Sequence, residues 1–248
     1  MKITKFRDLT LIHINNEQIM VVACDSSGGI GNKEFDVVKV EPEILGFYTT
    51  QVALMEVLAI GAKPITVVNA LAVEMYPDGE KIIKGVKKAL EPLDLEEDSI
   101  ITGSTEENIP VCQTAMGMTI IGTIDRSDFR KTTALKGNVA VSVGVPKVGD
   151  EVIADYGKEI MSIELMLKLV KDPNVNEVLP VGSKGILYEL GEMARTGDLD
   201  FVLEENLLVD IYKSAGPGTC AIISIDEEYY PIIKENFPIK INRIGKFL

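Results

Sequence analysis

The stretch from Asp25 to Leu71 constrains this chain most, because it joins three parts of a possible ligand site. An acid, Asp25, follows the apolar run 21–24, a glycine-rich turn ends in Lys33, and a helical run carries Glu56. Glycines let the backbone approach phosphate oxygens, a lysine neutralises their charge, and carboxylates bind Mg2+ as hard oxygen ligands. The stretch therefore predicts a magnesium–nucleotide site, with Asp25 and Glu56 as metal ligands.

The glycine-rich turn has a simpler alternative. It contains Gly28, Gly29, Gly31 and Asn32 before Lys33, and these residue types also suit a hairpin turn at a strand reversal. The Walker A spacing is absent, so this is not a P-loop of that class. Both the phosphate-binding and the hairpin interpretations remain open on residue types alone.

A second loop offers polar groups for the same ligand. Gly103, Ser104 and Thr105 supply a flexible turn and two hydroxyls, and Glu106 and Glu107 supply carboxylates. An ordinary turn that leads to the proline at position 110 is an equally good interpretation of this segment.

The periodicity predicts an α+β fold of two domains. The first half has strands at 9–14, 18–24, 35–40, 65–73, 99–102 and 115–124, a buried helix at 46–60 capped by Gly61, and a helix beginning at 77–79. A polar linker covers 125–136. The second half predicts strands at 138–145, 175–181, 199–203, 218–225 and 238–244, and helices at 158–171, 184–195, 205–213 and 227–236. We expect an N-terminal domain over 1–125 and a C-terminal α/β domain over 126–248 with partly parallel strands.

The net charge and the small number of histidines and cysteines exclude several kinds of function. The net charge is −13, which argues against nonspecific nucleic-acid binding and favours a metal beside any anionic ligand. His13 is the single histidine and the three cysteines (24, 112, 220) are far apart, which argues against zinc and disulfides and predicts small buried thiols. No apolar run is long enough to span a membrane, so we expect a cytoplasmic protein.

The order of these motifs resembles the superfamily of aminoimidazole ribonucleotide (AIR) synthetase, selenophosphate synthetase and thiamine monophosphate kinase. The turn 29–33 is similar to the family's G-V-G-T-K, and 56–64 is similar to its N-D-L-L-x-x-G-A-x-P helix end. Residues 102–107 stand where the family has G-G-[DE]-T. The resemblance covers residues 20–125.

This resemblance implies a two-domain AIR-synthase-like fold that binds ATP and Mg2+ in its first domain and dimerises through first-domain strands. Asn69 stands where the family has an acid, and Ser104 stands where it has a carboxylate, which leaves Glu106 or Glu107 as the substitute. The implied nucleotide-binding residues are Gly28, Gly29, Gly31, Asn32, Lys33, Gly103, Ser104 and Thr105. The implied metal ligands are Asp25, Glu56, Asn69 and Glu106.

The implied activity is Mg-ATP-dependent phosphoryl transfer to a small molecule. The segment 103–108 with Gln113 and Thr114 is most similar to the α-ribazole kinase group of cobalamin nucleotide-loop assembly, which phosphorylates a ribose hydroxyl. A thiamine-monophosphate-kinase-like enzyme or another ATP-dependent synthetase of the superfamily is the alternative. Because Asn69 and Ser104 replace acids, a non-catalytic nucleotide-binding regulatory protein is the alternative of another class.

Overall fold

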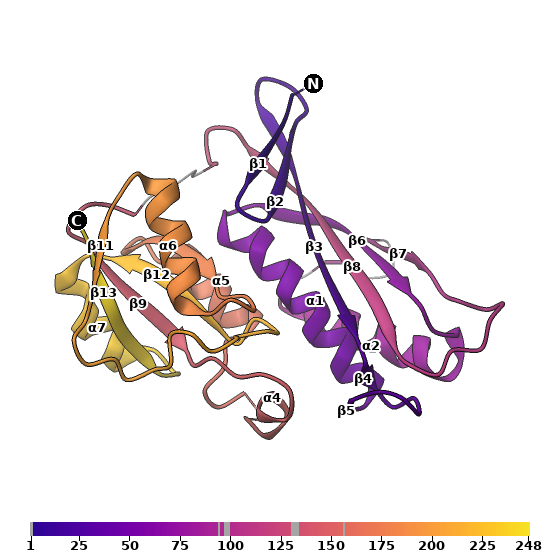
Figure 1. Ribbon diagram of the computed structural model, residues 1–248. Coiled ribbons are helices and arrows are strands. Elements are labelled where there is room, and N and C mark those ends of the chain that lie inside the picture. The colour runs from indigo at the N-terminus through magenta and orange to yellow at the C-terminus, as the bar shows by residue number, and fades with distance from the viewer. Residues whose placement is uncertain (1, 94, 97–99, 130–133, 156) are drawn as a thin grey trace. The chain divides into compact units, whose positions relative to one another are not determined.

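The computed structural model describes residues 2–93, 95–96, 100–129, 134–155 and 157–248 (Figure 1). The chain divides into two units by its internal contacts. The N-terminal unit comprises 1–57 and 62–128, and the C-terminal unit comprises 58–61 and 129–248. Among the described helices, none combines the length and the apolar character needed to cross a bilayer.

The N-terminal unit is built on a six-stranded sheet in the order β1-β2-β3-β8-β6-β7. Its strands are β1 (Lys2–Phe6), β2 (Leu9–His13), β3 (Gln18–Gly28), β6 (Lys63–Leu71), β7 (Ile101–Ser104) and β8 (Ala115–Asp125). Neighbours are antiparallel except β6 and β7, which are parallel. The long central pair runs from Gln18 opposite Asp125 to Gly28 opposite Ala115. β3 therefore extends four residues beyond the predicted end at 24, because β8 supplies partners for these residues.

The unit also contains the helices α1 (Pro42–Ala59) and α2 (Glu80–Leu90). α1 begins earlier than predicted, since a proline suits the first turn of a helix. It ends at Ala59, and Gly61, whose φ is +81°, follows it as the predicted cap. The helices approach closely through glycines: a Cβ at Gly46 would lie 2.1 Å from the Ile82 carbonyl oxygen, and one at Gly85 would lie 1.9 Å from that of Glu43. The predicted helix start at 77–79 is instead a wide turn, Met75–Gly79, before α2.

The C-terminal unit has a five-stranded sheet in the order β10-β12-β9-β13-β11. The strands are β9 (Val139–Gly144), β10 (Val175–Pro180), β11 (Phe201–Leu203), β12 (Cys220–Ile225) and β13 (Ile241–Phe247). The helices are α4 (Asp150–Asp155), α5 (Ile163–Lys171), α6 (Ile186–Gly197) and α7 (Tyr230–Asn236). Each of the four strand pairings is antiparallel, so the prediction of partly parallel strands is wrong. Alternating helices and strands indicated parallel pairing, but strands consecutive in the chain are separated in this sheet.

Three further predictions are corrected. The segment 205–213 is not helical; the Asp210 carboxylate accepts a hydrogen bond from the Tyr212 amide at 2.9 Å, which favours a turn. The strand predicted at 35–40 shrinks to β5 (Val38–Lys39), which pairs in parallel with β4 (Ile30–Gly31). Of the three thiols, only Cys220 is buried, and Cys24 and Cys112 are exposed.

Candidate functional site

One end of the N-terminal sheet brings the predicted segments together. β3 ends there at Gly28, β8 begins there at Ala115, and β6 and β7 end there at Leu71 and Ser104. The glycine-rich turn follows β3 directly, and the loop 105–114 joins β7 to β8. Two segments about 75 residues apart in sequence thus lie at the same edge of one sheet, as a shared ligand site requires.

The glycine-rich turn is not a hairpin. The Gly29 amide donates to the Thr114 carbonyl at 2.8 Å, and the Gly29 carbonyl accepts from the Val37 amide at 2.7 Å. The parallel pairing of β4 with β5 makes the chain loop back beside itself rather than reverse against β3. The hairpin alternative is therefore wrong, and the turn is a compact loop that projects from the sheet end.

A buried aspartate that the sequence analysis missed organises this loop. Asp36 accepts hydrogen bonds from the Lys33 amide at 2.9 Å, the Thr114 amide at 2.8 Å and the Thr114 hydroxyl at 2.7 Å. Gly31, with a φ of +151°, fits against this carboxylate: an added Cβ would lie 2.5 Å from Thr114 Oγ1 and 2.7 Å from Asp36 Oδ2. The loop thus needs glycine at 31 for close packing, and Asp36 fixes its shape.

Lys33, one of the predicted phosphate-binding residues, is paired with two carboxylates. Its ammonium lies 2.7 Å from Glu74 Oε2 and 3.5 Å from Asp78 Oδ2, and its side chain is 14% exposed. Burial opposes the charged form of Lys33, but the hydrogen bond and charge of Glu74 outweigh it and raise its pKa. The same hydrogen bond from Lys33, with backbone bonds, lowers the pKa of Glu74 to about 2. Any phosphate that uses Lys33 must compete with a carboxylate.

The loop after β7 is a structured turn. Glu106 accepts hydrogen bonds from the amides of Asn108 at 2.7 Å and Ile109 at 3.1 Å, and these bonds lower its pKa. Glu107 Oε1 accepts from the Met75 amide at 2.8 Å and from the Thr105 hydroxyl at 2.7 Å. Both glutamates therefore hold the loop in place at the edge of the site.

Asp25 and Asn69 lie in one row across the sheet, on the same face. Met118 pairs with Asp25 on one side and with Asn69 on the other, and Asn69 pairs in turn with Gly103. A Cβ at Gly103 would lie 2.3 Å from Asn69 Oδ1, so glycine leaves room for the amide. Burial raises the pKa of Asp25, although a backbone hydrogen bond at Ser26 acts in the opposite direction. Among the described residues, no lysine or arginine pairs with its carboxylate.

The four predicted metal ligands do not form one cluster. Within the described part of the chain, no three His, Cys, Asp or Glu side chains are grouped as a metal site would need. Glu56 is next to Val57, and Val57 packs on Gly122 of β8. Gly122 is four residues along β8 from Met118, which pairs with Asp25. At the rise of a β-strand, four residues correspond to about 13 Å. Glu56 thus lies in a part of α1 that packs away from the row that contains Asp25.

Mg2+ nevertheless fits one part of this edge. Magnesium in nucleotide sites is commonly held by one or two carboxylates together with substrate phosphates. Asp25 is a half-buried carboxylate without a cationic partner among the described residues, and such a group is stabilised by a cation. Asp25 is the residue that would hold the ion, with Asn69 as a neutral oxygen in the same row.

Comparison with known proteins identifies the fold. Residues 7–124 match the family model of AIR synthase related protein, N-terminal domain. Thermotoga maritima PurL complexed with AMPPCP superposes with a TM-score of 0.67 at 13% identity, over 96% of this chain and 42% of that chain. This chain thus spans less than half of PurL.

Two thiamine-monophosphate kinase structures are similar over most of both chains. The enzyme from Stenotrophomonas maltophilia gives a TM-score of 0.64 at 17% identity, covering 99% of this chain and 88% of that one. The structure described as AaThiL complexed with AMPPCP and TMP gives 0.61 at 16% identity, covering 98% and 86%. Identities this low establish the fold alone, and no curated protein sequence matches the chain. The sequence match over residues 7–124 therefore identifies an AIR-synthase-related N-terminal domain, and the chain shares the fold of these PurL and thiamine-monophosphate kinase structures.

Proposed function

We propose that the chain is a Mg-ATP-dependent small-molecule kinase that transfers a phosphoryl group to a hydroxyl of a nucleoside-like acceptor, with α-ribazole as the best candidate. The observation that carries the proposal is the meeting of the glycine-rich turn and the loop 105–114 at one sheet end, beside Lys33. Similar folds that hold AMPPCP support nucleotide binding.

The residues at this edge suit phosphoryl transfer, which depends chiefly on positioning and charge neutralisation. Backbone amides of the glycine-rich turn would bind phosphate oxygens, and Lys33 would neutralise their charge. Asp25 would hold Mg2+, which supplies charge neutralisation at the transferred phosphate. No histidine base is needed for this chemistry, in keeping with a chain that has one histidine.

The test of function is ATP consumption, measured with Mg2+ and with a chelator, in the presence of α-ribazole, thiamine monophosphate or aminoimidazole precursors. We expect Mg2+-dependent consumption with α-ribazole. If ATP is consumed with thiamine monophosphate and with none of the other acceptors, the protein is instead a thiamine-monophosphate-kinase-like enzyme. The two similar kinase structures favour this alternative.

A non-catalytic nucleotide-binding role is the second candidate. Lys33 is already paired with two carboxylates, and the predicted metal ligands do not gather in one chain. If ATP binds but no acceptor stimulates its consumption, the regulatory role is supported and the kinase proposal fails.

Glu74→Gln is expected to increase the affinity for ATP several-fold. The carboxylate competes with phosphate for Lys33, and its pKa of about 2 means that it stays ionised at any physiological pH. Removing that charge leaves Lys33 more available to an anion. Calorimetric titration with ATP and Mg2+ measures the change.

The matched control is Glu80→Gln, an exposed glutamate in the first turn of α2. Its affinity should equal that of the wild type. A weaker affinity in Glu74→Gln would show instead that Glu74 contributes to binding.

We also expect the protein to form a homodimer through strands of the N-terminal unit. β1 is a sheet edge, and Ile3 on it is exposed. Phe35, Val37 and Ile109 are also exposed on the loops at the candidate site, with Val37 at 83%. A monomer would leave an open edge and apolar side chains in water. Light scattering at micromolar concentration should give twice the chain mass, and a monomeric mass would exclude this assembly.

A further inference from the structure

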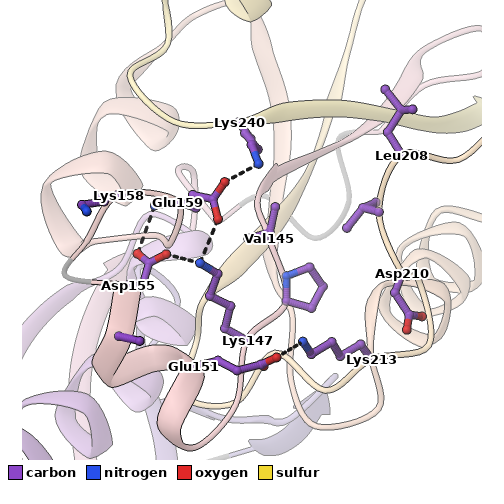
Figure 2. A pocket seen from close by; sticks show the side chains of 13 residues that line it. Val145, Lys147, Glu151, Asp155, Lys158, Glu159, Leu208, Asp210, Lys213 and Lys240 are labelled. Atoms are coloured by element: carbon purple, nitrogen blue, oxygen red, sulfur yellow. Dashed lines mark hydrogen bonds and ion pairs between the residues drawn. The ribbon is translucent and has the colours of Figure 1, made fainter.

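The C-terminal unit contains a cavity that plays no part in the proposal above. Its volume is about 650 Å³, within the range of small-molecule sites. Residues from four separate parts of the chain line it: 145–147 after β9; 151, 154, 155, 158 and 159 on and after α4; 208–210 and 213; and Lys240 before β13 (Figure 2). Segments distant in sequence thus form one concave surface within one unit.

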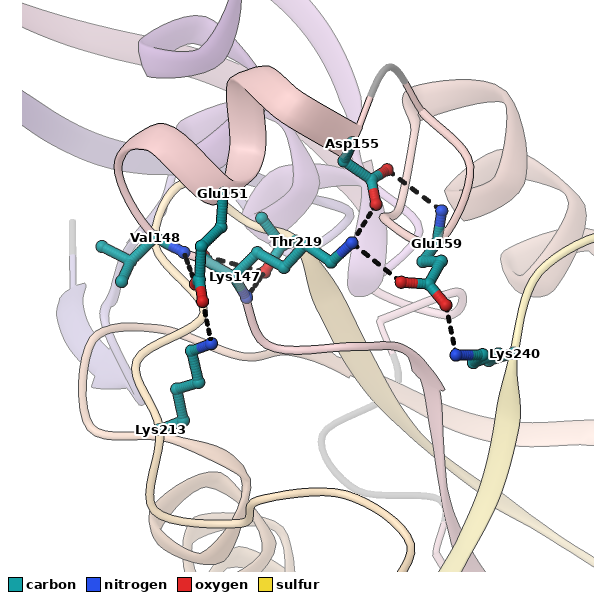
Figure 3. Close-up of polar contacts among 8 residues, drawn as sticks. All are labelled: Lys147, Val148, Glu151, Asp155, Glu159, Lys213, Thr219 and Lys240. Atoms are coloured by element: carbon teal, nitrogen blue, oxygen red, sulfur yellow. Dashed lines mark hydrogen bonds and ion pairs between the residues drawn. The ribbon is translucent and has the colours of Figure 1, made fainter.

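Charged side chains dominate one wall of this cavity. Lys147 pairs with Asp155, and its ammonium lies 2.8 Å from Glu159 Oε2 (Figure 3). The Asp155 side chain is 1% exposed, and the Lys147 amide donates to Thr219 Oγ1 at 3.0 Å. Lys147 is therefore fixed in position by buried groups, as a preorganised binding residue would be.

Glu159 occupies the place of an anion between two ammonium groups. Its carboxylate pairs with Lys147 on one side and with Lys240 on the other, and both lower its pKa. Its own side chain is about one-third exposed, at 32%, so solvent and ligands reach it. A second pair, Lys213 with Glu151 at 2.7 Å, also lines the cavity.

The residues that line the cavity favour a phosphate as the bound anion. The lining cations are all lysines, at positions 147, 158, 213 and 240. Lysine ammonium groups bind phosphate as compact point charges, with no fixed fork geometry to satisfy, so several of them can surround one phosphate. Val145, Pro146 and Leu208 supply an apolar part of the lining, with Asp210 nearby, and Leu208 is 81% exposed. An apolar or ring-shaped ligand body would cover it.

We propose that this cavity binds a small phosphomonoester, whose phosphate displaces Glu159 from between Lys147 and Lys240 and whose apolar body lies on Leu208. The site uses residues of the C-terminal unit alone. It is therefore independent of nucleotide binding at the N-terminal sheet.

Calorimetric titration with phenyl phosphate, without nucleotide or Mg2+, tests the proposal. Inorganic phosphate and phenol, the two halves of this probe, are titrated separately for comparison. We expect phenyl phosphate to bind more tightly than either half. Lys240→Gln should weaken that binding roughly tenfold, because a charge-assisted contact is lost. Glu159→Gln should tighten it, because the competing carboxylate is gone.

The structure offers a matched control in the same unit. Lys246 pairs with Glu227 at 2.6 Å but does not line the cavity, so Lys246→Gln should bind phenyl phosphate as the wild type does. Lys240 is 63% exposed, so its replacement should not disturb folding, and melting curves check this. The proposal is overturned if phenyl phosphate gives no binding heat at millimolar concentration. It is equally overturned if Lys240→Gln binds as the wild type does, or if Glu159→Gln fails to bind more tightly.

Discussion

Asp25→Asn should raise the melting temperature of the nucleotide-free protein and, at the same time, weaken its binding of Mg-ATP. Burial raises the pKa of Asp25, so the folded state holds the proton more tightly than the unfolded chain does. The ionised form at neutral pH therefore costs stability, and a neutral side chain of the same shape removes that cost. Loss of the carboxylate removes the proposed metal ligand, which should lower the affinity by about thirtyfold or more.

The raised pKa of Asp25 also predicts how the affinity for Mg-ATP depends on pH. As the pH falls through the raised pKa of Asp25, the carboxylate is protonated and the affinity of the wild type for Mg-ATP should fall. Asp25→Asn should lack this phase. The control is Asp8→Asn, an exposed aspartate in the turn between β1 and β2. If Asp25→Asn is less stable than the wild type, Asp25 has a structural role and the ligand assignment is wrong.

Asp36→Asn should destabilise the N-terminal unit and abolish measurable nucleotide binding. The Asp36 carboxylate accepts three hydrogen bonds and is 5% exposed. An asparagine can accept at one oxygen only, so its amide group would face the Lys33 amide donor to donor. An unsatisfied buried donor costs about 1 to 3 kcal/mol, which lowers the melting temperature by at least about 5 °C.

Thermal melts and titration with Mg-ATP measure both effects. Glu34→Gln is the matched control, since Glu34 is exposed two residues away in the same loop. An Asp36→Asn protein with wild-type affinity would show that the shape of the glycine-rich turn does not determine binding.

Local patterns predicted the parts of this fold that depend on nearby residues. The alternation of β-branched residues located the long strands β3 and β8, and Gly61 marked the end of α1 correctly. The glycine-rich turn and the loop after β7 were recognised by residue type and order. Their position at one sheet end could be expected only from the resemblance to a family.

The contacts that decide the chemistry join residues far apart in sequence. Asp36 meets Thr114 across 78 residues, and Lys33 meets Glu74 across 41 residues. A single sequence carries no signal for such pairs, so Asp36 and Glu74 were missed. Strand direction failed in the C-terminal unit for a related reason: the order β10-β12-β9-β13-β11 separates consecutive strands, and alternation alone cannot show this.

The central claim is that the N-terminal sheet end binds ATP through Mg2+. Its most direct test is calorimetric titration of the intact protein with AMPPCP, first with Mg2+ and then with a chelator, on the wild type and on Asp25→Asn. We expect tight binding by the wild type with Mg2+, and weak binding both in the chelator and in Asp25→Asn. Equal affinity of the wild type with Mg2+ and with the chelator would contradict it.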